Sequence, residues 1–304
     1  HTATLLPDGR VLVVGGRGVA DARGPAEVWD PSTDTFSAAG EPAAWRSWST
    51  ATLLPDGRVF TAGGYPSSSA EVWDPATNTF SPAGSPGVGS ISDSVLLPDG
   101  RVLVAGSDNV SLGNGDYEAL AAARVWDPAT STFTSAGESA LGGIRSATLL
   151  PSGRVLVLGD NQPASAEVWD PATGTFDPAG TGLAAEYYYS TTALPDGRVL
   201  IVGGCVGHSC HIEPGVLDTA VVWDPETSAF VAAGPIDGGR LDHTATLLPD
   251  GRVLVVGGWG DGDITPIHTT AEVWSTSGGQ APAEQPPIQP RPAESGHQLK
   301  GERQ

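Results

Sequence analysis

The stretch Leu5–Gly16, LLPDGRVLVVGG, recurs along the chain and decides the fold. Related strings begin at Leu53, Leu96, Leu149, Ala193 and Leu247. A second string follows each copy after a variable stretch, as in AEVWDPSTDTF at residues 26–36. A unit of roughly 50 residues that returns along a chain indicates a repeat architecture, in which each unit is one supersecondary module.

Each unit carries the signals of four short strands. The first strand ends in Thr-Leu-Leu, as at His243–Leu248, and Pro-Asp-Gly then forms a tight turn. Arg-Val-Leu-Val-Val is a β-branched apolar run that suits a buried second strand. Ala-Glu-Val-Trp forms the third strand, Asp-Pro begins another turn, and Thr-Phe opens the fourth strand. The sequence therefore predicts an all-β fold, a six-bladed β-propeller of four-stranded antiparallel blades.

The last unit ends differently from the others. It stops after Trp274 without a Thr-Phe string, so we expect the last blade to be incomplete. Its missing strand is expected to come from residues upstream of His1, or a seventh blade lies there. We assign residues 1–275 to the propeller and residues 276–304, which are rich in proline and polar residues, to a linker or disordered tail.

The repeat resembles the Kelch repeat of β-propellers. A double glycine ends the second strand at Gly15, Gly63, Gly203 and Gly257, each with the glycine after it. Aromatic residues follow at two fixed positions, first at Trp29, Trp73, Trp126, Trp169, Trp223 and Trp274, then at Phe36, Phe80, Phe133, Phe176 and Phe230. The family usually has tyrosine at the first position and tryptophan at the second. The resemblance implies the fold and says little about function, because one fold hosts many functions.

The charge balance restricts the partners. The chain has 35 acidic and 15 basic residues, a net charge of −20. Such a chain repels nucleic acid and anionic membrane surfaces, so we expect no nucleic-acid partner. No apolar run is long enough to span a bilayer, and we expect no membrane insertion. We expect a monomeric propeller within a larger chain.

The two cysteines lie close together. Cys205 and Cys210 belong to the glycine-rich segment GGCVGHSCHIEPG. They can close a short disulfide loop or remain free thiols. A disulfide favours an oxidising compartment, so we expect an extracellular or cell-surface protein.

The two ends of the blades are expected to differ in role. The Pro-Asp-Gly and Asp-Pro turns are nearly constant and lie on one face, the turn face. The loops after Gly-Gly and the segments just before each first strand, here called lead-in segments, lie on the other face, the loop face. They vary, and variable loops on a rigid scaffold usually carry function. The candidate ligand-binding residues there are Trp45, Arg46, Trp48, Arg145, Tyr187, Tyr189, Arg240, Asp242, His243 and Trp259. Aromatic rings and guanidinium groups suit sugars or peptides.

An enzyme at the same face is the alternative to a binding module. Copper-radical oxidases similar to galactose oxidase use a Kelch-type propeller, and the resemblance implies tyrosine and histidine ligands with a cysteine–tyrosine crosslink. Here His208, His211 and the two cysteines lie in the fifth repeat unit, and Tyr187 lies where that unit begins. No tyrosine is directly followed by a histidine. Glu213 and Asp218, like Asp261 and Asp263, do not complete an iron or calcium motif. We therefore assign no catalytic residue, metal ligand or cofactor, with copper as the alternative.

The sequence thus predicts an extracellular Kelch-propeller binding module. It recognises a protein or a carbohydrate ligand through the loop face. The alternative is an enzyme at the same face, either a galactose oxidase-like copper oxidase or a sugar-modifying enzyme.

Overall fold

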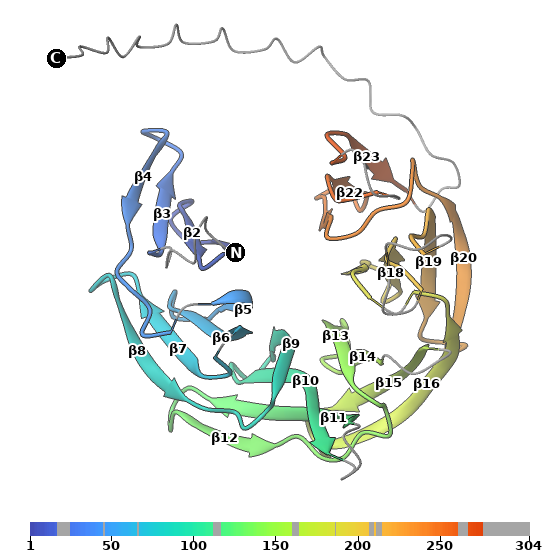
Figure 1. The fold of residues 1–304 in the computed structure, drawn as a ribbon, viewed down its shortest axis with the longest axis horizontal. Helices are drawn as coiled ribbons and strands as arrows, with labels where there is room; N and C mark the ends of the chain where they lie inside the picture. Colours follow the sequence, from blue (N-terminus) through green and yellow to red (C-terminus); the bar gives the residue numbers. More distant parts are fainter. Residues whose placement is uncertain are drawn as a thin grey trace, which may run out of the picture.

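The protein consists of six small antiparallel sheets arranged around a common centre (Figure 1). The computed structural model describes residues 1–16, 25–44, 46–65, 67–111, 117–159, 164–185, 187–206, 210, 215–260 and 267–275. Five sheets have four strands and the last has three, so the predicted six-bladed propeller with an incomplete last blade is confirmed. Residues 276–304, the predicted tail, lie outside the described part. Across the described ranges there is no helix long and apolar enough to cross a bilayer.

Blades 1 to 3 each follow the chain order, with neighbouring strands antiparallel. Blade 1 comprises β1 (Thr2–Leu5), β2 (Val11–Val14), β3 (Glu27–Asp30) and β4 (Thr35–Ala38). Blade 2 comprises β5 (Ser47–Leu53), β6 (Val59–Tyr65), β7 (Ala70–Asp74) and β8 (Thr79–Gly84). Blade 3 comprises β9 (Ser90–Leu96), β10 (Val102–Ser111), β11 (Tyr117–Asp127) and β12 (Thr132–Ser135).

Blades 4 to 6 repeat this arrangement. Blade 4 comprises β13 (Ile144–Leu149), β14 (Val155–Gly159), β15 (Ala164–Asp170) and β16 (Thr175–Leu183). Blade 5 comprises β17 (Ser190–Ala193), β18 (Val199–Val202), β19 (Thr219–Asp224) and β20 (Ala229–Pro235). Blade 6 comprises β21 (Thr244–Leu247), β22 (Val253–Val256) and β23 (Ala271–Trp274).

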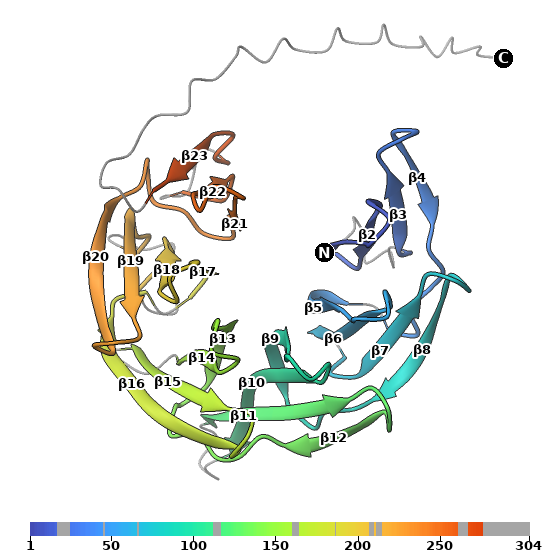
Figure 2. The ribbon, with the colours of Figure 1, turned by 180° about the vertical axis from the view of Figure 1, so that it is seen from behind.

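The first strand of each blade lies nearest the centre and the fourth lies at the rim (Figures 1 and 2). Short polar side chains join some of these inner strands. The hydroxyls of Thr52 in β5 and Ser94 in β9 are 2.7 Å apart. Thr148 in β13 donates to the hydroxyl of Thr191 in β17 at 2.8 Å. These bonds satisfy hydroxyl groups where the blades converge, and they hold neighbouring blades in register.

The turn between the first two strands of each blade explains the recurring Pro-Asp-Gly-Arg letters. In blade 2, Leu54 N–H donates to the carbonyl of Arg58 at 2.8 Å, and Gly57 has φ of 86°. Asp56 accepts both the backbone N–H and the Nε–H of Arg58, at 3.1 and 2.7 Å. Glycine is needed because other residues rarely adopt this left-handed backbone. The turn face is therefore built from the repeat itself.

The tryptophan of the repeat packs between neighbouring blades. Trp73 is cross-strand partner to Phe80, packs with Val14 and Val28 of blade 1, and donates from Nε1 to the carbonyl of Ala39 at 2.9 Å. Its side chain thus combines a large buried apolar area with a satisfied polar atom.

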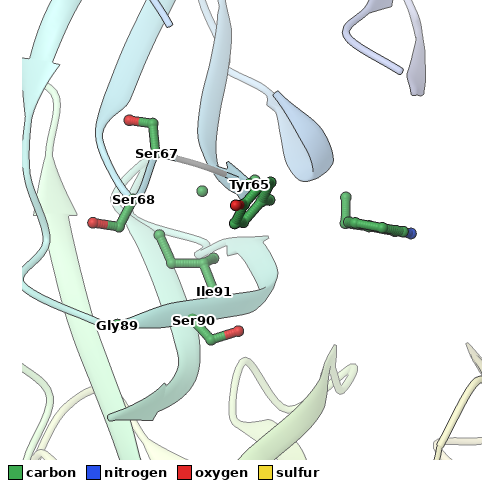
Figure 3. A pocket seen from close by; sticks show the side chains of 9 residues that line it. Tyr65, Ser67, Ser68, Gly89, Ser90 and Ile91 are labelled. Carbon is green, nitrogen blue, oxygen red and sulfur yellow. The ribbon is translucent and has the colours of Figure 1, made fainter. Parts of the chain in front are cut away.

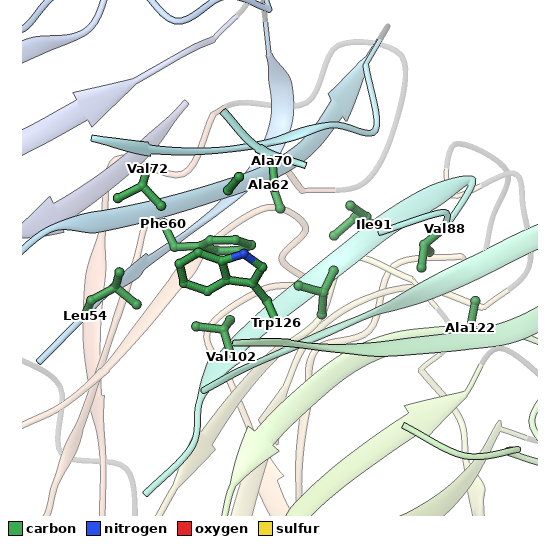
Figure 4. Packing of buried hydrophobic residues seen from close by; sticks show 12 residues of the cluster. Leu54, Phe60, Ala62, Ala70, Val72, Val88, Ile91, Val102, Ala122 and Trp126 are labelled. Carbon is green, nitrogen blue, oxygen red and sulfur yellow. The ribbon is translucent and has the colours of Figure 1, made fainter. Parts of the chain in front are cut away.

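Between blades 2 and 3 the packing differs, because Phe60 stands where the other units have leucine. The Phe60 ring packs against the ring of Trp126 (Figure 4), and the two ring centroids are 4.6 Å apart.

The row of blades has two ends, and the ring is open between blade 1 and blade 6 (Figure 1). On blade 1, Leu5 is 65% exposed and Phe36 is 59% exposed. On blade 6, Val256 is 42% exposed, whereas its repeat equivalent Val14 is fully buried. These apolar faces are of the kind that pack between neighbouring blades elsewhere.

Candidate functional site

Three lead-in segments share an uncommon backbone conformation. Trp48, Tyr188 and Asp242 have φ of 58°, 59° and 53°, and they occupy one position of the repeat. The other described non-glycine residues with positive φ share a position in the Asp-Pro turn: Asp34, Asn78, Ser131 and Ser228. Left-handed backbone costs roughly 1–2 kcal/mol per ordinary residue and clusters at functional sites. The Asp-Pro turns recur with the repeat, whereas the lead-in segments vary in sequence, so the lead-in segments of blades 2, 5 and 6 are the candidate functional positions.

A hollow of about 430 Å³ opens beside two of these residues. We call it the aromatic hollow. Blades 2 to 5 supply its lining through Trp48, Ser90, Ile91, Ser92, Arg145, Tyr187, Tyr188 and Tyr189. Trp48 is 69% exposed and Tyr188 is 53% exposed, so both offer large apolar surfaces to solvent. The volume and the mixture of aromatic and polar groups are typical of small-molecule sites.

One wall of the aromatic hollow is held by aromatic and cationic contacts. The guanidinium carbon of Arg145 lies 4.7 Å from the ring centroid of Tyr187. The rings of Tyr187 and Tyr188 lie 6.3 Å apart at 45°. A cation over an aromatic face is attracted by the ring electrons, so Arg145 and Tyr187 fix each other's position.

The cysteine pair supports the same wall. Cys205 and Cys210 form a disulfide bond, and Cys205 is fully buried. Cys205 N–H donates to the carbonyl of Tyr187 at 2.9 Å. The disulfide-bonded Cys205 thereby anchors the backbone from which Tyr187 projects.

Two of the predicted arginines belong to the scaffold. Arg46 is 0% exposed, donates to the carbonyls of Gly63 and Ser69 at 2.7 and 2.6 Å, and pairs with Glu71 at 2.9 Å. Arg240 is equally buried and pairs with Glu272 at 3.2 Å. Neither side chain presents surface to a ligand. Arg46 and Arg240, which we predicted to bind a ligand, are therefore structural residues. Each holds the loop after Gly-Gly of its own blade in place.

His243 also points into the protein. It is 8% exposed, and its Nε2 lies 2.8 Å from the hydroxyl of Ser190 in the neighbouring blade. Burial, reinforced by the positive charge of Arg240, lowers the pKa of His243 to about 4. The imidazole is therefore neutral at pH 7 and joins blades 5 and 6.

The remaining residues of the predicted binding set lie in different places. Four of them line the aromatic hollow: Trp48, Arg145, Tyr187 and Tyr189. Asp242, in the lead-in of blade 6, is exposed as a whole residue. Its carboxyl group is partly buried, and this burial raises the pKa of that carboxyl. Trp259 is 54% exposed, pairs through its backbone with Leu241, and is not part of this lining. Trp45 lies outside the described residues.

The predicted binding set does not include four residues that line the hollow, namely Ser90, Ile91, Ser92 and Tyr188. Tyr188 carried a usable signal, because it stands at the same repeat position as Trp48. Ser90 and Ile91 begin an ordinary inner strand, and only the convergence of the blades brings them to the site. Another hollow, of about 460 Å³, lies on the turn face among Pro98, Arg101 and Asp170. Its lining comes from turn residues that recur in the repeat, so we assign it to the scaffold.

Asp93 is a titratable group where the inner strands converge. Its carboxylate accepts hydrogen bonds from the backbone N–H groups of Ser94 at 2.8 Å and of Ala147 in blade 4 at 3.0 Å. Burial outweighs these bonds and raises the pKa of Asp93 to about 6. The pKa of Asp93 is therefore higher in the folded protein than in the unfolded chain. Its contribution to the free energy of unfolding is complete below about pH 4 and is lost as the pH rises through about 6.

Replacing Asp93 with asparagine should therefore change the pH dependence of stability. From pH 4 to pH 7 the free energy of unfolding of Asp93→Asn should rise relative to wild type, by on the order of 1–3 kcal/mol. Urea denaturation of both proteins at several pH values measures this difference. The opposite contribution of His243 is common to both proteins and cancels. A difference that stays constant from pH 4 to pH 7 would contradict the assigned pKa.

Comparison with known proteins shows partial similarity in sequence and similarity in fold. No family model matches the chain. Over 92 residues it is 32% identical to each of two galactose oxidases from Gibberella zeae; this segment is 30% of the chain and 14% of each oxidase. A solved structure described as a novel fungal alcohol oxidase of the AA5 family, in complex with copper, aligns over 90% of this chain and 73% of its own, with a TM-score of 0.53 and 17% identity. The chain is thus a six-bladed propeller whose fold is similar to that of this alcohol oxidase and whose sequence is similar to galactose oxidase over part of its length.

The described side chains of this Kelch propeller do not fit the copper-radical site that the resemblance implies. The sulfur of Cys205 is bonded to Cys210, which leaves no thiol for a crosslink to tyrosine. Residues 187–189 are three tyrosines followed by Ser190, so a Tyr-His pair is missing. Among the described residues, no three His, Cys, Asp or Glu side chains gather as metal ligands would. His208 and His211, like the acidic pair Asp261 and Asp263, lie outside the described part.

Proposed function

We propose that this Kelch propeller is an extracellular binding module that takes a carbohydrate in the aromatic hollow. One observation carries the proposal. Four blades converge on a hollow of about 430 Å³ whose exposed aromatic side chains, Trp48 and Tyr188, are displayed by left-handed backbone.

The chemistry of the lining favours a sugar over other ligands. A pyranose ring has apolar C–H faces and a rim of hydroxyls. Flat aromatic side chains such as Trp48 and Tyr188 offer apolar surface to the faces. The hydroxyls of Ser90 and Ser92 can donate or accept hydrogen bonds, and the Arg145 guanidinium is a donor. Apolar walls with a few polar groups are the usual composition of a site that orients a small ligand.

The disulfide supports the extracellular part of the proposal. Bonds such as Cys205–Cys210 persist in oxidising compartments and are rare in the cytosol of ordinary cells. The strong negative charge of the chain keeps it soluble and directs it away from anionic polymers.

Replacing Trp48 with alanine should remove the stacking surface. We expect the affinity for a bound sugar to fall at least about tenfold, which corresponds to about 1.4 kcal/mol. Isothermal titration calorimetry with a panel of neutral saccharides, built from glucose, galactose, xylose or N-acetylglucosamine and one to four units long, measures it. Trp259→Ala is the matched control, because Trp259 is similarly exposed but is not part of the hollow's lining. Equal losses in both variants would contradict the proposed location.

A copper oxidase is the second candidate, favoured by the likeness to galactose oxidase and to a copper-bound alcohol oxidase. Metal analysis and a peroxide assay separate the two functions. The binding module is expected to bind saccharide equally well with and without added copper and to release no hydrogen peroxide. Stoichiometric copper together with copper-dependent oxidation of the bound sugar would overturn the binding-module proposal.

A further inference from the structure

A second hollow, of about 350 Å³, adjoins the aromatic hollow. The two share Trp48, Ser90 and Ile91 in their linings, so they are neighbours across one wall. The second hollow continues toward the loop after Gly-Gly of blade 2, where Tyr65, Ser67 and Ser68 surround it with Gly89 on the blade 3 side (Figure 3). We call it the tyrosine hollow.

The lining of the tyrosine hollow has the same chemistry as the first. Tyr65 is 69% exposed and adds another aromatic face. Ser67, Ser68 and Ser90 contribute hydroxyls. The lining includes no charged side chain, and the whole chain is strongly acidic. An uncharged, hydroxyl-rich ligand is therefore favoured over an acidic one.

The floor of the tyrosine hollow is closely packed and hydrogen-bonded. Gly63 and Gly64 carry no side chains there, and a Cβ on Gly63 would lie 2.7 Å from the Cβ of Ile91, too close for any other residue. Beneath them the buried Arg46 donates to the carbonyls of Gly63 and Ser69 at 2.7 and 2.6 Å. The loop is thus held in place before a ligand arrives, which reduces the entropy lost on binding.

From these observations we infer that the ligand is a neutral oligosaccharide of at least two sugar units. One unit occupies the aromatic hollow and the next occupies the tyrosine hollow, with Trp48 contacting both. This inference rests on the proposed function, and it adds the length of the ligand and the direction in which it runs, from blades 4 and 5 toward blade 2.

Chain-length dependence tests the inference. With the neutral saccharide panel, the affinity of wild type should increase at least about tenfold between the one-unit and the three- or four-unit members of the series that binds. In Tyr65→Ala this increase should disappear while the affinity for the single sugar is retained. Trp48→Ala should weaken every member, and Trp259→Ala should behave as wild type. Tyr65 is largely exposed, so its replacement leaves the packed blades intact.

The possible failures are distinguishable. If one-unit and four-unit saccharides bind equally well, or if Tyr65→Ala keeps the increase with length, the inference is wrong while carbohydrate binding stands. An equal loss for short and long members in Tyr65→Ala also overturns it. If no member of the panel binds the wild-type protein, the proposed function itself fails.

Discussion

Replacing Trp169 with alanine is expected to lower the free energy of unfolding by about 3–5 kcal/mol. The indole is 1% exposed, lies 6.3 Å from the ring of Phe176 and donates from Nε1 to the carbonyl of Ala136 at 2.8 Å. Alanine loses the buried apolar area, leaves a cavity between blades 3 and 4, and removes the donor of a buried carbonyl. Urea denaturation followed by far-ultraviolet circular dichroism measures the loss.

Trp29 provides the matched control for this prediction. It occupies the same repeat position in blade 1, but its side chain is only partly buried because no blade covers that face among the described residues. The same substitution there should cost distinctly less than at Trp169. Equal costs would show that the face of blade 1 is covered in solution.

Changing Glu71 to glutamine is expected to destabilise the protein by about 3–5 kcal/mol. The side chains of Arg46 and Glu71 are 0% and 4% exposed, and their nitrogen and oxygen atoms lie 2.9 Å apart. Glutamine keeps the shape and can still accept from the N–H of Ala43, as Glu71 does at 2.8 Å. It leaves the guanidinium charge buried without a counterion, and that uncompensated charge is the source of the loss. Urea denaturation at pH 7 measures it.

The same chemical change at an exposed pair is the control. Asp250 and Arg252 lie 2.7 Å apart on the turn face, where both side chains are about half exposed (51% and 52%). Water and salt screen such pairs, so Asp250→Asn should lower the free energy of unfolding far less than Glu71→Gln does. A cost for Glu71→Gln as small as that for Asp250→Asn would mean that the buried pair does not hold the loop.

The scaffold could be predicted from the sequence because each structural requirement is repeated. The pairing of Trp169 with Phe176 recurs in five blades, and the turn at Gly57 recurs in all six. The lengths of β10 and β11 were not predictable in the same way. They extend to 10 and 11 residues because their pairing continues as far as Ser111 and Tyr117, through residues that are not part of the repeated strings.

The site was only partly predictable. Trp48 and Arg145 were found because they break the repeat in the lead-in segments, where variation is informative. Arg46 breaks the repeat too, yet it is buried, because burial depends on Glu71, two strands away in the same blade. A signal existed: blades 2 and 6 carry both the arginine and the glutamate, whereas blade 3 has Gly89 and Arg124 at those positions. Whether a side chain is buried beneath the loop face depends on the tertiary structure, and the type of residue alone does not predict it.

Nuclear magnetic resonance of the tryptophan indole N–H groups tests the central claim most directly, since it observes the loop face and the scaffold in one spectrum. The protein is titrated with a neutral tetrasaccharide that binds it, and the peak of Trp48 is assigned with Trp48→Phe. We predict that this peak shifts on titration while those of the buried repeat tryptophans, such as Trp73 and Trp169, stay in place. A Trp48 peak that does not move while the saccharide binds would contradict the account.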